Sequence, residues 1–202
     1  MSETLLKVDN LGITFGGLKA VQKVNLYLNR GELIGLIGPN GAGKTTMFNM
    51  LTGVYAPTEG SIIFGGKSIA GLDPYKVTRQ GISRTFQNIR LFKELSVLDN
   101  VKVANHGLAK HNLLSSIFRL PSHFKGEAKM EEESLAFLKI FGLDVYKDEL
   151  AKNLPYGMQR RLEIARALAA GPKLLLLDEP AAGMNPQETH DLMELIAFIR
   201  KE

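Results

Sequence analysis

The pattern of apolar and polar residues near the N-terminus predicts a β-rich beginning of the chain. Between residues 6 and 10, alternating positions are charged, as expected for a strand with one buried face. Apolar runs at residues 13–15 and 21–28 flank a Gly16-Gly17 turn, which is typical of a hairpin. We therefore expect a hairpin-rich β region in the first 30 or so residues.

Turn and capping signals divide the next part of the chain into short elements. They predict an apolar strand at 33–37, a helix from Lys44 to near Gly53, a hairpin at 61–69, a helix from Asp73-Pro74 to Gly81, and a strand at 82–86.

From residue 88 the pattern changes, because strand signals disappear and helical periodicity takes over. One predicted helix begins at Ser96. Three more are predicted at residues 113–118, 127–141 and 157–170. Four leucines at 174–177 then predict a fully buried strand, and Asn185-Pro186 begins a last helix. We therefore predict one α/β domain over residues 1–202, in which a helical subdomain at 88–171 is inserted into a β-rich core.

Composition narrows the class of protein. The chain has 202 residues, 45% hydrophobic and 23% charged, which is ordinary for a globular domain. It has no cysteine, which excludes disulfides, and its net charge of +4 is spread rather than gathered into a nucleic-acid-binding stripe. The N-terminus lacks a signal-peptide core, and no apolar run approaches the ~20 residues of a membrane span, so we expect a cytoplasmic protein.

The strand predicted at 33–37 leads into a glycine-rich turn and a helix, with the spelling G-x-x-x-x-G-K-[ST]. Backbone N–H groups of such a turn, at the positive end of the helix, can surround an anion. Lys44 would reach the β- and γ-phosphates, and Thr45 would offer its hydroxyl to Mg²⁺. A turn that binds nothing is the alternative, but the flanking strand and helix favour a nucleoside triphosphate site. Its residues are Gly38, Pro39, Asn40, Gly41, Ala42, Gly43, Lys44, Thr45 and Thr46.

An acidic pair ends the leucine strand. Asp178 would hold Mg²⁺ through water at the carboxyl end of the strand, where α/β sheets bind ligands. Glu179 is free to orient and deprotonate a water molecule. Alone, such a pair would be interpreted as a helix cap or turn, but the phosphate loop upstream favours the catalytic role.

With these motifs the chain resembles the ATP-binding cassette (ABC) ATPases, the motor subunits of ABC transporters, from Leu5 to the last helix. The resemblance implies a P-loop fold of ABC type that uses ATP and Mg²⁺. It implies that Phe15 stacks on adenine, with plain core packing as the alternative. It also implies that Gln87 ligates Mg²⁺ with Thr45 and Asp178 and senses a transmembrane partner. The motifs, in the family's order, are GPNGAGKTT, Gln87, Leu154-Pro155-Tyr156-Gly157-Met158, LLLLDEP and Ala182-Gly183-Met184-Asn185.

The signature segment departs from the family's spelling Leu-Ser-Gly-Gly-Gln, which binds the γ-phosphate of ATP held by the opposite subunit. Pro155, Tyr156 and Met158 stand at three of its positions, so the serine hydroxyl is missing. The backbone N–H groups at the start of the helix remain, and we expect Gly157 to contribute in trans. A plain helix start is the alternative for the side chains.

Within the family, the spelling resembles the branch that serves branched-chain amino acid import. The cues are Arg84-Thr85-Phe86-Gln87, Leu-Pro-Tyr-Gly, Ala-Ala-Gly-Met-Asn-Pro and the long stretch at 106–126. This branch implies two cassettes docked on transmembrane permease subunits at the inner face of the membrane, with a solute-binding protein as an indirect partner and no nucleic acid. Arg90, Leu91 and Phe92 are candidates for the permease contact, with ordinary packing as the alternative. The competing functions are a non-transport ABC ATPase and a non-catalytic nucleotide-binding module.

One element that the family carries, a strand after the last helix, is absent from this sequence. The family places a switch histidine at the end of a strand after the last helix, and this sequence stops before that strand. His190 lies out of register and is interpreted as a solvated helix residue. We therefore expect the sequence to be part of a longer protein, with a C-terminal strand missing.

Overall fold

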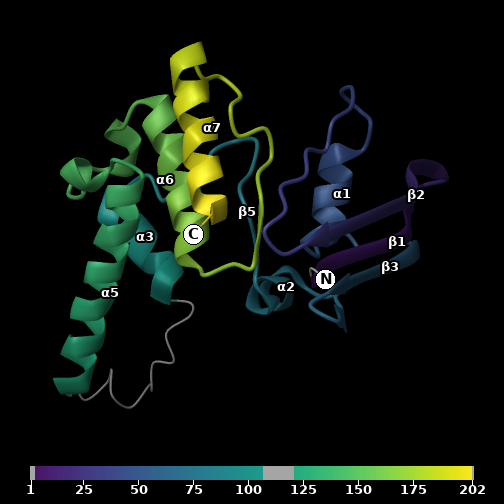
Figure 1. The fold of residues 1–202 in the computed structure, drawn as a ribbon, viewed down its shortest axis with the longest axis horizontal. Coiled ribbons are helices and arrows are strands. Elements are labelled where there is room, and N and C mark those ends of the chain that lie inside the picture. Colours follow the sequence, from purple (N-terminus) through teal and green to yellow (C-terminus); the bar gives the residue numbers. More distant parts are fainter. Residues whose placement is uncertain (1–2, 107–120, 202) are drawn as a thin grey trace. The chain divides into compact units, whose positions relative to one another are not determined.

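The computed structural model describes residues 3–106 and 121–201, and it divides the chain into two compact units (Figure 1). The first unit runs from the N-terminus to Ile82 and includes the end of the last helix from Ile196. The second unit is Ser83–Leu195.

The first unit is built on an antiparallel sheet with the strand order β2-β1-β3-β4. Its long strands β1 and β2 form the predicted hairpin around Gly16-Gly17, and β3 lies along the other side of β1 (Figure 1). Both predicted hairpins are therefore confirmed. The strands are β1 (Thr4–Phe15), β2 (Leu18–Asn29), β3 (Glu59–Phe64) and β4 (Lys67–Ser68).

Strand β1 is central because its apolar side chains supply much of the buried core of this unit. Leu6, Val8, Leu11 and Ile13 are all buried. The expected alternation fails at Asn10, which is exposed with φ 47° where the register with β2 shifts. The strand therefore changes its inward-facing set at an irregularity that the pattern did not show.

Two helices complete the described part of the first unit. Helix α1 (Lys44–Leu51) buries Met47, Met50 and Leu51 and packs against β2. Helix α2 (Pro74–Gln80) begins at Asp73-Pro74 and ends at Gly81. Both helices were predicted with these boundaries to within two residues.

The prediction of a buried strand at residues 33–37 is wrong. This segment has no regular structure, and its apolar side chains are exposed, with Ile37 at 93%. No strand within residues 3–106 and 121–201 pairs with it. An apolar run indicates a tendency to be buried, but a strand also needs a neighbour to bond its N–H and C=O groups.

The second unit is mainly helical, with one two-stranded sheet of β5 and β6. Helix α3 packs against both α5 and α6 (Figure 1). The elements are β5 (Ile82–Arg84), α3 (Val97–His106), α5 (Pro121–Ile140), η1 (Asp144–Tyr146), η2 (Ala151–Asn153), α6 (Tyr156–Ala169), β6 (Leu174–Leu176) and α7 (Pro186–Lys201). The predicted helix at 113–118 lies outside the described residues. Among the described helices, none combines the length and the apolar character needed to cross a membrane.

The capping signals of the second unit are confirmed. The Ser96 Oγ accepts a hydrogen bond from the Asp99 N–H at 2.9 Å at the start of α3. At α7, Asn185 and Glu188 each accept a hydrogen bond from the other's backbone N–H, at 2.9 and 3.0 Å, which makes a capping box. Each cap satisfies an N–H group that a helix start leaves without an intrahelical partner.

Two features of the second unit, the start of α5 and the burial of β6, differ from the sequence prediction. Helix α5 begins at Pro121, six residues before the expected start, because proline is well suited to a first helical turn. Strand β6 is not fully buried, since Leu174 and Leu176 are buried while Leu175 is half-buried.

A buried amide holds the turn that precedes α3. The fully buried Asn100 accepts a hydrogen bond from the Phe92 N–H at 2.9 Å. Its Nδ2 donates to the carbonyls of Phe92 at 3.0 Å and Ser96 at 2.9 Å. One side chain thus satisfies three backbone groups of residues 92–96.

We expect Asn100→Ala to lower the free energy of unfolding by about 1–3 kcal/mol, because buried backbone groups lose their partner. Asn105→Ala on the same helix is the matched control, since the Asn105 amide donates to Glu133 at an exposed position, at 3.1 Å. Urea unfolding would measure both. Equal losses in the two variants would contradict this account of Asn100.

Candidate functional site

The predicted site residues fall into two groups, one in each unit. In the first unit, the phosphate loop precedes α1 and has φ 84° at Gly41 and 85° at Gly43, as predicted. The Lys44 Nζ donates to the carbonyls of Gly38 at 2.6 Å and Pro39 at 2.9 Å. The lysine therefore curls back over its own loop, so its ammonium group lies beside the loop backbone.

Gly43 is fixed by its surroundings as well as by its φ angle. It stands immediately before α1 in the left-handed conformation. A Cβ atom at this position would lie 2.9 Å from Val21 Cγ2 and 3.0 Å from the Ala20 carbonyl oxygen, both in β2. A side chain would push the start of α1 away from the strand, so only glycine lets the helix begin here.

Phe15 ends β1 and is 43% exposed. Its ring meets the edge of the Tyr55 ring, with centroids 5.2 Å apart and an interplanar angle of 73°. This exposure disfavours the core-packing alternative. An exposed aromatic pair offers ring surface to a planar ligand.

In the second unit, Asp178 forms a buried ion pair with Arg84. The Arg84 guanidinium donates to the Asp178 Oδ2 at 2.7 Å, and the two side chains are only 5% and 9% exposed. The pairing of β5 with β6 brings them together, as the Thr85 N–H donates to the Leu176 carbonyl at 3.0 Å. The sequence interpretation quoted Arg84 as part of a motif but assigned it no partner.

Glu179 contacts Gln87, which lies in a loop that is far from Glu179 in the sequence. The Gln87 Nε2 donates to the Glu179 Oε2 at 3.0 Å. Glu179 has φ 47°, a left-handed conformation that costs a non-glycine residue about 1–3 kcal/mol. Adjacent carboxylates of Asp178 and Glu179 thus engage different partners, and the glutamate is exposed while the aspartate is buried.

Two charged residues of α6, Arg160 and Glu163, bind the backbone around Gln87. The Arg160 Nη1 donates to the Phe86 carbonyl at 2.6 Å and to the Glu163 carboxylate at 2.7 Å, and its Nη2 donates to the Gln87 carbonyl at 2.8 Å. The Glu163 Oε1 accepts from the N–H groups of Phe86 at 3.4 Å and Arg90 at 3.1 Å.

Sequence reasoning assigned Arg160 and Glu163 no role. A usable signal was present, because opposite charges three residues apart share a helix face. They are interspersed with the apolar periodicity of Leu162, Ile164 and Ala165, all fully buried. Charged residues within a buried stripe need partners.

The segment after Gln87 carries further cation–aromatic contacts. The Arg90 guanidinium lies 4.1 Å from the centre of the Phe86 ring, and the Arg166 guanidinium lies 5.2 Å from that of Phe92. Burial lowers the pKa of the Arg166 guanidinium from its usual value, and the charge of Glu163 partly opposes this shift. Phe92 remains 49% exposed.

The altered signature segment packs against residues 183–188. A Cβ atom at Gly157, in the first turn of α6, would lie 2.6 Å from the Glu188 Oε1. The ring of Tyr156 lies 3.2 Å from the position of a Cβ at Gly183. Gly157 therefore admits a close carboxylate, and Tyr156 covers the turn before α7. Pro155 is the N-cap of α6.

His190 is exposed on α7 and lies 3.4 Å from Glu194, one helical turn away. The prediction of a solvated helix residue is therefore confirmed.

The predicted magnesium ligands were a hydroxyl, an amide and a carboxylate, oxygen donors of the kind that Mg²⁺ prefers. No cluster of three or more His, Asp or Glu side chains that could hold a metal occurs among the described residues. The Asp178 carboxylate is paired with the Arg84 guanidinium at 2.7 Å, so a magnesium ion would have to share or replace this cation. Binding of Mg²⁺ by Thr45, Gln87 and Asp178 stays a prediction.

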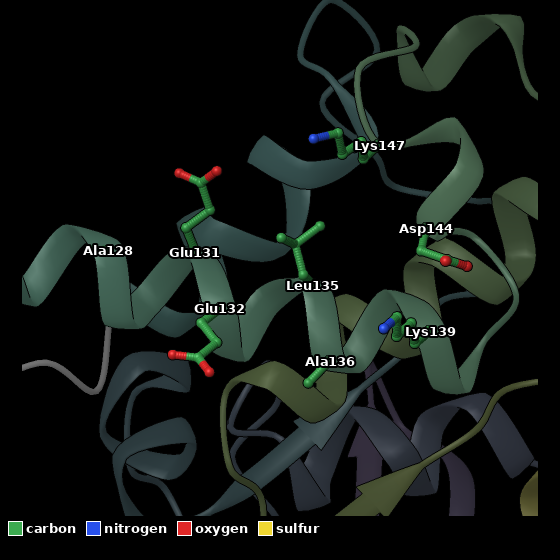
Figure 2. Close-up of a pocket in the computed structure, with 8 residues that line it drawn as sticks. All are labelled: Ala128, Glu131, Glu132, Leu135, Ala136, Lys139, Asp144 and Lys147. Carbon is green, nitrogen blue, oxygen red and sulfur yellow. The ribbon is translucent and has the colours of Figure 1, made fainter.

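A pocket lined by α5 together with Asp144 and Lys147 contains none of the predicted site residues. Figure 2 shows Glu131 and Glu132 at one end of it and Lys139 and Lys147 at the other. Its charged, helix-surface lining differs from the glycine-rich loop and strand-end carboxylates described above.

Comparison with known proteins places these groups in a family. The model of the ABC transporter family matches residues 21–182. The high-affinity branched-chain amino acid transport ATP-binding protein BraF of Pseudomonas aeruginosa is 47% identical over 202 residues, which cover 100% of this chain and 79% of that protein. The corresponding LivG of Escherichia coli is 48% identical over 200 residues, which cover 99% of this chain and 78% of LivG.

A solved structure agrees with this assignment. The ADP conformation of MJ1267, an ATP-binding cassette of an ABC transporter, matches with a TM-score of 0.83 and 30% identity, over 99% of this chain and 78% of that one. The expected fold class is thereby confirmed. The chain belongs to the ABC transporter family, as one of its ATP-binding cassettes.

Proposed function

We propose that this chain hydrolyses ATP to power an ABC importer for branched-chain amino acids. The observation that carries the proposal is the contact of the Gln87 amide with the Glu179 carboxylate at 3.0 Å, beside a buried Asp178. A glutamate held in this way, without a buried cationic partner of its own, suits the orientation of a water molecule. The printed names of BraF and LivG supply the solute class.

The phosphate loop would bind the nucleotide. Backbone N–H groups of residues 38–46 would surround the phosphates at the positive end of α1. Lys44 would exchange the carbonyls of Gly38 and Pro39 for the β- and γ-phosphate oxygens. Phe15, exposed beside Tyr55, would stack on the adenine.

Hydrolysis would depend on Glu179 as the general base, oriented by Gln87. Thr45, Gln87 and Asp178 would hold Mg²⁺ with the nucleotide. When bound, the ion neutralises phosphate charge and fixes the geometry of the phosphates. Positioning and charge stabilisation would supply most of the rate, as in other phosphoryl-transfer sites.

The active form would be a pair of cassettes, each phosphate loop facing the start of α6 in the partner. Since Pro155 replaces the serine of the family's signature, the backbone N–H groups at Gly157 would bind the γ-phosphate in trans. The half-exposed Phe92, with Arg90 and Leu91, would contact the permease subunits at the inner face of the membrane. A solute-binding protein would act on the permease rather than on this chain.

The central test is Glu179→Gln in the full-length protein. We expect ATP binding to persist while turnover falls about 10²–10⁴-fold, because the general base is lost. Glu132→Gln, the same change at an exposed position of α5, is the control and should keep its turnover. Phosphate release and ATP binding would be measured in parallel. Near-normal turnover of the Glu179 variant would remove it from this role.

We expect Gly43→Ala to raise the dissociation constant for ATP about tenfold, equivalent to about 1.4 kcal/mol, because the start of α1 must shift. Gly66→Ala is a matched control, since Gly66 has φ 77° and no atom within 4 Å of an added Cβ. Both variants carry the backbone strain, but only the first disturbs the loop. Titration with a fluorescent ATP analogue would measure the effect. Equal affinities would show that the Gly43 contacts do not govern binding.

The solute is tested separately by uptake in cells that lack the gene. Uptake of leucine, isoleucine and valine should fall and be restored by the wild-type protein but not by Glu179→Gln. Unchanged uptake of all three amino acids would overturn the assigned solute class while leaving the ATPase assignment intact.

A further inference from the structure

We infer that Arg160 and Glu163 are positioning residues for hydrolysis: together they anchor the backbone on both sides of Gln87 to helix α6, so that the Gln87 amide moves with α6. The inference rests on the proposed role of Gln87 and adds two residues and a route of regulation to it. Both side chains are buried and bind the backbone of residues 86–90, so each would act through the Gln87 loop.

Burial is the first argument. Arg160 is 0% exposed and Glu163 is 2% exposed, although both are charged. Burying two opposite charges at this depth costs desolvation free energy, and only well-made hydrogen bonds offset that cost. A pair of apolar residues would fill the same space in a helix whose neighbouring positions Leu162, Ile164 and Ala165 are also buried. The charges therefore call for an explanation beyond packing.

The hydrogen bonds supply that explanation. Four of the pair's contacts go to the backbone of residues 86–90, two to carbonyl oxygens and two to N–H groups. Arginine contributes the donors for the carbonyls and glutamate the acceptor for the N–H groups, so each residue serves the loop groups that the other cannot. The bond between Arg160 and Glu163 at 2.7 Å holds the two halves of this anchor together.

The anchor binds the main chain of Gln87 and not its side chain, so the side-chain amide can contact Glu179. The Gln87 carbonyl is held by Arg160, while its amide donates to Glu179 at 3.0 Å. Fixing the main chain on either side of Gln87 limits the positions that this amide can adopt. The consequence is that the hydrogen bond between Gln87 and Glu179 depends on the orientation of α6.

Helix α6 is also the element whose first turn carries Gly157. One helix thus joins the segment proposed to meet the partner's nucleotide with the backbone of the chain's own Gln87. A rotation of α6 on engagement would shift Gln87 relative to Glu179. Engagement of a partner cassette would thereby be linked to the orientation of Glu179, the proposed catalytic base of the same chain.

The test is a double-mutant cycle in the full-length protein with Glu163→Gln and Gln87→Ala. Glu163→Gln alone should lower kcat about 10- to 100-fold with little change in the KM for ATP, as for loss of an outer partner that orients a site residue. In the Gln87→Ala background, the same change should cost less than about twofold, because its effect runs through Gln87. Losses that multiply in the double variant would overturn the inference.

Two further variants separate positioning from stability. Arg160→Met combined with Glu163→Leu removes the anchor but keeps an apolar core, so the protein should still fold, with lower stability because backbone groups of residues 86–90 lose partners, while kcat falls to the same degree. Glu131→Gln, which breaks the 3.8 Å ion pair between α5 and α3, is the matched control and should leave kcat unchanged. A folded double variant with wild-type kcat would overturn the inference.

Hydrogen exchange gives a readout independent of turnover. The amides of Phe86 and Arg90 should exchange faster in Glu163→Gln than in the wild type, whereas both should remain protected in Glu131→Gln. Unchanged protection would show that the pair does not hold the loop. If Gln87→Ala itself leaves kcat unchanged, the proposed catalytic role of Gln87 fails, and the exchange data still decide whether the anchor exists.

Discussion

The buried ion pair of Arg160 and Glu163 is the interaction on which the arrangement of the second unit's site residues depends. Placing charges in a protein interior is unfavourable unless hydrogen bonds replace the lost water. In this unit the replacements are backbone groups of residues 86–90. The same bonds that make the burial of charge tolerable also hold the backbone at Gln87, so the core and the position of Gln87 have one physical origin.

A second buried pair, Arg84 with Asp178, acts in the same direction. It connects the end of β5 to the end of β6, and only a few residues beyond it Gln87 meets Glu179. Residues 84–90 are therefore held from two sides, by the strand-end carboxylates and by α6. Such a segment responds to displacement of either neighbour.

The altered signature segment has a structural rationale that its spelling alone does not reveal. Tyr156 covers Gly183, and Gly157 accepts the Glu188 carboxylate at a distance that a side chain would exclude. Glu188 is itself fixed by the capping box with Asn185 at the start of α7. The ring of Tyr156 and the absent side chain of Gly157 are thus both matched to residues of the turn before α7 and its first turn.

The sequence by itself determined the features whose chemistry is local. The phosphate loop could be predicted because glycine permits φ values near 85°, and the caps of α3 and α7 because serine and asparagine satisfy N–H groups of their own helix. The hairpins followed from turn residues between apolar runs.

Tertiary structure alone decided the outcome wherever a distant partner was needed. Residues 33–37 look like a strand but have no strand beside them in the described part of the chain. The buried charges Arg84, Arg160 and Glu163 found partners in Asp178 and the Gln87 loop, which are remote in the sequence. Periodicity records which residues prefer the interior, and it cannot specify which remote group will meet them there.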